Sequence, residues 1–174
     1  MSTLSEVGSG QLTAEGATVS SRRLRLVDYL DEGRVISNLQ GGTRDAVLAE
    51  MIKAFGGHPL VTDLSEFRAA IFAREEQAST GVGGGLAIPH ARTDAVTDFV
   101  AALGRSAHGL DFGSTQGGPV RIVVMMGIPD HRLNGYLRML SHLSLIFKRP
   151  GLVQELLDAP DAAAILRLLE RHEG

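Results

Sequence analysis

The spacing of apolar residues predicts helices and strands that alternate along most of the chain. Residues 24–30 have the pattern of a short helix, and residues 34–40 alternate between apolar and polar positions like a strand. A longer helix is expected from Thr43, a suitable N-cap, to about Phe55, where two glycines follow. The apolar stripe of this helix consists of Val47, Leu48, Met51 and Ile52.

A second capped helix is predicted before a glycine-rich segment. Asp63 is the expected N-cap. Leu64, Phe67 and Ile71 are spaced for one face of this helix, and Arg74 continues that face by one further turn. The glycines that follow the helix begin at Gly81.

The remaining sequence predicts three strands and then three helices. The strands are LAIP at 86–89, residues 99–103, and VRIVVMMGI at 120–128, whose near-continuous apolar run indicates burial on both faces. The next helix is marked by Leu133, Leu137, Leu140 and either Leu143 or Ser144. Pro150 is expected to open another helix at its first turn, and residues 162–169 form the last one. This order predicts an α/β fold, a three-layer single domain with a mixed β-sheet flanked by helices on both faces.

The first 22 residues differ from the rest. They are rich in Ser, Thr, Gly and Glu and lack periodicity, which predicts a flexible N-terminal tail over 1–22 ahead of one domain over 23–174. A length of 174 residues fits a single domain with a sizeable core.

Charge and cysteine content restrict the possible functions. The net charge of −3 argues against a nucleic-acid surface, and the absence of cysteine excludes disulfides and thiolate chemistry. No basic segment followed by an apolar run opens the chain, and the longest apolar stretch, residues 122–128, is too short to span a bilayer. We therefore expect a cytoplasmic protein without direct membrane insertion.

The segment STGVGGGLAIPHAR, residues 79–92, is the main candidate for chemistry. It fits neither nucleotide motif, because Leu86 stands where the last glycine would be, no lysine follows, and the loop comes after a helix. Backbone N–H groups in such a turn can hold an anion, and Pro89 would present His90 from a rigid point. A neutral imidazole, an anion-binding turn and a nearby arginine suit phosphoryl transfer. A Pro-His pair at a strand edge is also common, so residue types alone leave both interpretations open.

The longer stretch REEQASTGVGGGLAIPHAR, residues 74–92, resembles the phosphorylation-site segment of phosphotransferase-system EIIA domains of the fructose/mannitol type, which include the nitrogen-regulatory subgroup. These domains typically read R-E-…-S-T-G-[IV]-G-x-G-[IL]-A-[IV]-P-H. A weaker resemblance extends from about Leu24 to Leu169. It implies that His90 accepts phosphate through Nε2 and that Arg74 is the arginine of the site. The residues it implies for the turn that shapes the phosphate pocket are Ser79, Thr80, Gly81, Gly83 and Gly85.

One position departs from the family pattern. The family usually carries a second histidine at the start of the helix after the long strand, and the residue here is Tyr136. A tyrosine can donate one hydrogen bond to a phosphate but carries no positive charge near neutral pH. His131 lies just before this helix and could swing in, whereas His142 faces elsewhere. We hypothesise a slowed or regulatory phosphoacceptor.

The resemblance implies a phosphocarrier that takes phosphate from the carrier HPr or a paralogue and forms a phosphohistidine. The phosphate would pass to an EIIB cysteine or stay as a signal, and any EIIB and EIIC partners would be separate chains. The alternative is a non-catalytic regulatory binding module that docks on a transporter or kinase. No cofactor is expected. A metal site built from His90, His108 and His131 is not expected either, because no two histidines are spaced for a shared helix face.

Overall fold

A computed structural model describes residues 23–113 and 117–174, so the tail predicted over 1–22 lies outside the described residues. Within the described residues, one mixed sheet contains six strands in the order β1-β5-β6-β3-β2, and β4 also pairs with β6. The strands are β1 Val35–Ile36, β2 Gly81–Gly83, β3 Leu86–Ala87, β4 His90–Arg92, β5 Val100–Leu110 and β6 Val120–Ile128. The two long strands, β5 and β6, are antiparallel, whereas β3 and β4 run parallel to β6.

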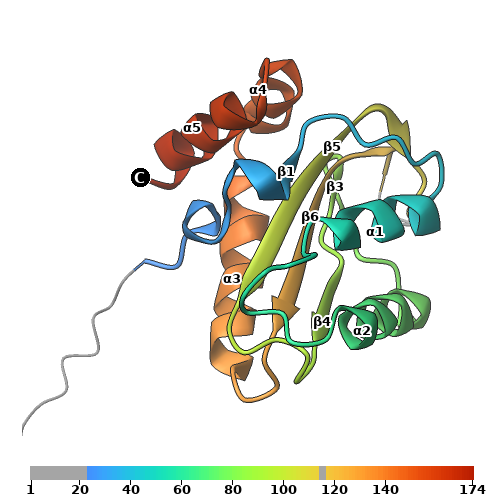
Figure 1. Cartoon of the computed structure of the whole chain (residues 1–174). Helices are drawn as coiled ribbons and strands as arrows, with labels where there is room; N and C mark the ends of the chain where they lie inside the picture. Colours follow the sequence, from blue (N-terminus) through green and yellow to red (C-terminus); the bar gives the residue numbers. More distant parts are fainter. Residues whose placement is uncertain (1–22, 114–116) are drawn as a thin grey trace, which may run out of the picture.

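Helices cover both faces of this sheet (Figure 1). On one face lie α1 (Arg44–Lys53) and α2 (Leu64–Gln77), and on the other lie α3 (Leu133–Ile146), α4 (Leu152–Asp158) and α5 (Ala162–Glu173). Two short 3₁₀ helices, η1 (Leu26–Tyr29) and η2 (Glu32–Arg34), precede β1. The predicted three-layer α/β fold with a mixed sheet is confirmed.

The two N-caps predicted from the sequence are present. The Thr43 side chain accepts a hydrogen bond from the backbone of Ala46, and the Asp63 side chain accepts one from Glu66. Each satisfies a backbone donor that the first turn of a helix leaves free. These caps fix the starts of α1 and α2, and thereby the position of the α2 C-terminus near the glycine-rich segment.

Two hydrophobic cores lie on opposite faces of the sheet, as the apolar run of β6 predicts. Ile122, Val124 and Met126 belong to the core under α3, α4 and α5, while Val123 and Met125 belong to the core under α1 and α2. Side chains of a strand alternate between faces, so a strand between two helical layers needs apolar residues at every position. The expected burial of β6 on both faces is confirmed.

The strand predicted at 86–89 ends at Ala87, and a second short strand begins at His90. Leu86 and Ala87 pair with Ile122 and Val123 on β6, and pairing resumes at His90, opposite Met126. Pro89 has no N–H to donate, but its carbonyl accepts from the backbone N–H of Met126. The proline therefore separates β3 from β4 while both stay on the same edge of β6.

Some predicted boundaries and faces are wrong. Leu133 and Leu137 are 44% and 52% exposed, because α3 buries the overlapping stripe of Met139, Leu143 and Ile146. Pro150 lies outside α4, whose N-cap is Gly151 in a left-handed conformation. Other elements differ in length: β5 and α5 extend beyond the ranges 99–103 and 162–169, whereas β1 and β3 are shorter than 34–40 and 86–89.

Candidate functional site

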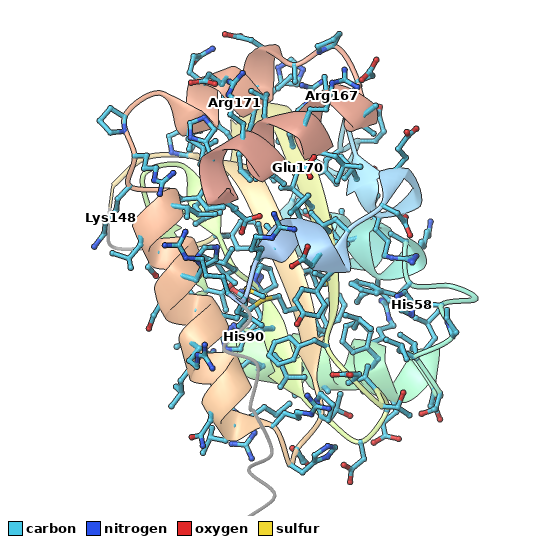
Figure 2. All side chains as sticks on the ribbon, turned by 90° about the vertical axis from the view of Figure 1, so that its left-hand side faces the viewer. His58, His90, Lys148, Arg167, Glu170 and Arg171 are labelled. Carbon is cyan, nitrogen blue, oxygen red and sulfur yellow. The ribbon has the colours of Figure 1, made fainter. Side chains whose placement is uncertain are left out.

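His90 opens β4 with its imidazole ring fixed on both sides. Its side chain is 7% exposed, and its Nδ1 lies 2.7 Å from the Ile88 carbonyl oxygen. A carbonyl oxygen only accepts, so Nδ1 carries the ring proton and Nε2 keeps its lone pair. The Tyr136 hydroxyl lies 2.8 Å from Nε2 and donates to it. Figure 2 shows His90 beside α3, the helix that carries this tyrosine.

Burial lowers the pKa of His90 below its usual 6.5, because a charged imidazole loses hydration inside the protein. The hydrogen bond to the Ile88 carbonyl raises the pKa, the positive charge of Arg74 lowers it, and the negative charge of Glu75 raises it. The net lowering keeps the ring neutral near pH 7. A neutral ring with its proton on Nδ1 has its nucleophilic lone pair on Nε2.

A buried carboxylate supports the His90 ring through a chain of hydrogen bonds. Glu75, which is 2% exposed, accepts from the Thr80 backbone N–H at 3.0 Å and from the Thr80 hydroxyl at 2.6 Å. The Thr80 carbonyl accepts from the Ile88 N–H at 2.9 Å, and the Ile88 carbonyl accepts from the His90 ring. The end of α2 is thereby connected to the orientation of the imidazole.

Glu75 is a site residue that the sequence analysis missed. The buried face of α2 is Phe67, Ile71 and Glu75, so the predicted continuation of this face through Arg74 is wrong. The sequence contains a signal for this role, because Glu75 lies four residues after Ile71 and so falls on the apolar stripe of the helix. A charged residue at such a position needs buried partners, and Thr80 provides them.

Arg74 is half-buried at the C-terminal end of α2, and its guanidinium donates to the Ala78 carbonyl oxygen at 3.0 Å. Its charge acts on the His90 ring, which it makes harder to protonate. A cation whose charge reaches the ring in this way also favours an arriving anion. The structure therefore brings Arg74, His90 and Tyr136 into one site.

The predicted glycine turn is a short hairpin between β2 and β3. Gly83, Gly84 and Gly85 all have positive φ, which explains why glycine is used there. The Gly85 carbonyl accepts from the backbone N–H groups of Arg121 and Ile122, which fastens the hairpin to β6. Gly83 and Gly84 line a cavity of about 380 Å³ at the end of α3, and His90 is not part of its wall.

Ser79 and Thr80 have structural partners in place. The Ser79 hydroxyl donates to the Phe112 carbonyl oxygen at 2.5 Å and accepts from the Gly81 N–H at 3.2 Å. The Thr80 hydroxyl is held by Glu75. Both residues thus shape the segment that leads to His90, and their hydroxyls are engaged.

The other histidines near α3 lie apart from the site. His142 contacts Glu173, with 2.6 Å between Nε2 and Oε1, as expected for a histidine that faces elsewhere. His131 is exposed and makes no hydrogen bond or ion pair within the part of the chain that the structure describes. Across residues 23–113 and 117–174, no group of three or more His, Asp or Glu side chains could hold a metal ion. No helix in these ranges is long and apolar enough to cross a bilayer.

The family model described as "Phosphoenolpyruvate-dependent sugar phosphotransferase system, EIIA 2" matches residues 28–172. The chain belongs to this family. The "PTS system fructose-specific EIIABC component" of Bacillus subtilis is 31% identical over 150 residues, which are 86% of this chain and 24% of that protein. The "Nitrogen regulatory protein" of Pseudomonas aeruginosa is 28% identical over 151 residues, which are 84% of this chain and 95% of that protein. This EIIA-family chain thus spans about a quarter of the first relative and nearly all of the second.

Solved structures agree with the fold assignment. The nitrogen regulatory protein IIA-Ntr of Neisseria meningitidis superposes with a TM-score of 0.76 at 23% identity, covering 82% of this chain and 97% of that one. The mannitol IIA enzyme in its complex with phosphorylated IIB from Escherichia coli gives a TM-score of 0.71 at 16% identity, covering 82% and 97%. Both are similar to this EIIA-family chain in fold.

Proposed function

We propose that this EIIA-family chain is a phosphocarrier that accepts a phosphoryl group on Nε2 of His90 from a phosphohistidine of an HPr-type carrier. The observation that carries the proposal is the hydrogen bond from Nδ1 of His90 to the Ile88 carbonyl. It fixes the tautomer whose lone pair is on Nε2, the nitrogen that faces Tyr136. Burial supports the same form, because it lowers the pKa of the ring.

The transfer needs few proton movements. The bond between phosphorus and the donor's nitrogen breaks while a bond between phosphorus and Nε2 of His90 forms. Nε2 carries no proton to remove. The ring N–H proton stays on Nδ1, hydrogen-bonded to the Ile88 carbonyl oxygen, which stabilises the positive charge that the ring gains. Arg74 favours the anionic phosphoryl group, and the Tyr136 hydroxyl must leave Nε2 before the phosphorus can approach.

The next acceptor in this proposal is EIIB, whose cysteine sulfur would take the phosphoryl group from Nε2. The family resemblance implies this partner, and a mannitol IIA relative in fold has been solved with phosphorylated IIB. We place the phosphoacceptor domain at 23–174, in the cytoplasm, with Ser79, Thr80, Gly81, Gly83 and Gly85 shaping the segment that leads to His90. The net charge of −3 gives no reason to expect a nucleic-acid partner.

A second candidate is a regulatory module that docks on a transporter or kinase and passes no phosphate on. Tyr136 favours it, because a hydroxyl on the acceptor nitrogen slows transfer. The similarity to a nitrogen regulatory protein along nearly its whole length supports it too. Incubating the phosphorylated chain with a panel of EIIB proteins separates the two candidates, since a pure regulator transfers phosphate to none of them.

The acceptor role is tested by incubation with phosphoenolpyruvate, Enzyme I and HPr, followed by intact-mass analysis. We expect a gain of one acid-labile phosphate that is absent from His90→Ala. His131→Ala is the matched control and should gain the phosphate, because that side chain is exposed and unpartnered within the described residues. A folded chain that gains no phosphate with several HPr paralogues would contradict the proposal.

A further inference from the structure

A groove of about 530 Å³ lies between α3, the end of α5 and the segment that precedes η1, and neither His90 nor Tyr136 is part of its wall. Its apolar wall includes Leu137 and Leu145, which are 52% and 68% exposed. Its cationic residues are Arg23, Arg138 and Arg149. The volume lies in the range of sites for small organic molecules, roughly 300–1,000 Å³.

Two arginines of the groove, Arg138 and Arg149, have no carboxylate partner among the described residues. Arg23 donates to a main-chain oxygen of Gly174 at 3.2 Å, and Arg149 donates to the His172 carbonyl oxygen. The peptide carbonyl of His172 accepts a hydrogen bond but does not neutralise the Arg149 guanidinium. Arg138 is exposed and makes no hydrogen bond or ion pair within the described residues. Arg138 and Arg149 bring two like charges to one groove, and each lowers the energy of a negative group placed beside it.

The one acidic side chain of the wall, that of Glu173, is already fully engaged. Its side chain is 0% exposed. It accepts from the backbone N–H groups of Leu26 and Val27 at 2.6 and 2.9 Å, and its Oε1 lies 2.6 Å from Nε2 of His142. These bonds join η1, α3 and α5, the elements that form the groove. The groove is therefore held in shape without a ligand, which reduces the entropy cost of binding.

From this combination we propose that the groove binds a small organic anion with two negative charges and an apolar body. The planar guanidinium groups pair with carboxylate or phosphate oxygens through two parallel hydrogen bonds. The apolar part of the ligand would pack on Leu137 and Leu145, the exposed leucines of α3. The site is independent of phosphoryl transfer at His90, so either proposal can fail without the other.

The probe for this site is 1-naphthyl phosphate, a phosphate monoester with a flat apolar body, titrated into the full-length chain by calorimetry. We expect Arg138→Ala to weaken binding by about tenfold, through the loss of a charge-assisted pair. Arg167→Ala is the matched control, since Arg167 is an exposed arginine on α5 (Figure 2) with no partner among the described residues and is not part of the groove. It should leave the affinity unchanged.

Amide chemical shifts locate the probe. Shifts confined to residues 137–149 and 172–174 support the groove, and 1-naphthol without the phosphate should bind at least tenfold more weakly. The proposal is overturned if the probe does not bind at millimolar concentration, or if both arginine variants weaken it equally. It is also overturned if the shifts appear at His90 and residues 79–85, which would mean that the phosphate occupies the phosphoacceptor site alone.

Discussion

Replacing Tyr136 by phenylalanine removes the hydrogen bond on the proposed acceptor nitrogen and little else. The hydroxyl oxygen is 2.8 Å from Nε2 of His90. The two rings have their centroids 5.2 Å apart at an interplanar angle of 43°, and a phenylalanine ring keeps this contact. The variant therefore isolates one donor, with the packing of α3 against the site unchanged.

The size of the rate change follows from the hydrogen bond between Tyr136 and His90, which must break before phosphoryl transfer. A hydrogen bond between neutral groups contributes about 0.5–1.5 kcal/mol net. The lone pair that accepts this bond is the one that attacks phosphorus, so the bond adds its full value to the barrier. We expect Tyr136→Phe to accept phosphate about two- to twelvefold faster than the native chain, because each ~1.4 kcal/mol changes a rate tenfold. The pKa of His90 should rise at the same time, since the lost donor favoured the neutral ring.

The assay is a single-turnover transfer from labelled phospho-HPr, quenched at successive times. Tyr29→Phe is the matched control, because Tyr29 is the other tyrosine of the chain and packs on Phe99, away from His90. Its rate should equal that of the native chain. A slower Tyr136→Phe variant would refute the reasoning, because it would mean that the hydroxyl stabilises the transferring phosphoryl group more than it blocks the nitrogen.

Three further predictions concern the same site. Tyr136→His should also raise the rate in the transfer assay, since an imidazole can bring a positive charge to the phosphoryl oxygens; an unchanged rate would show that the position gives no support. The rate should rise with pH to a plateau with its midpoint below 6.5, because burial lowers the pKa of His90 and the protonated ring has no lone pair on Nε2. An NMR titration of the ring should give the same midpoint, and one above 6.5 would contradict this account. Glu75→Ala should lower the free energy of unfolding by about 3 kcal/mol in urea denaturation, because it leaves the buried hydroxyl and N–H of Thr80 unpaired. Glu76 is its exposed neighbour, and Glu76→Ala should change the free energy of unfolding by less than about 0.5 kcal/mol.

The sequence by itself determined the architecture and indicated the family. A near-continuous apolar run at 120–128 requires helices on both faces of its strand, and Thr43 and Asp63 mark helix starts through local hydrogen bonds. These signals are local, since they depend on neighbours within a few residues. The motif around His90 was specific enough to indicate the family, which the match over residues 28–172 confirms.

Only the tertiary structure decided which faces are buried and what surrounds His90. The leucines of α3 fit two overlapping stripes, and packing on the sheet selected the one that leaves Leu137 exposed. The contact between Tyr136 and His90 joins α3 to β4, two elements that local spacing cannot relate. The end of α5 was underestimated for the same reason, because its last turn places Glu173 against the distant backbone of Leu26. Periodicity shows that a face is apolar, whereas the neighbour that covers it is chosen by the free energy of packing the whole domain.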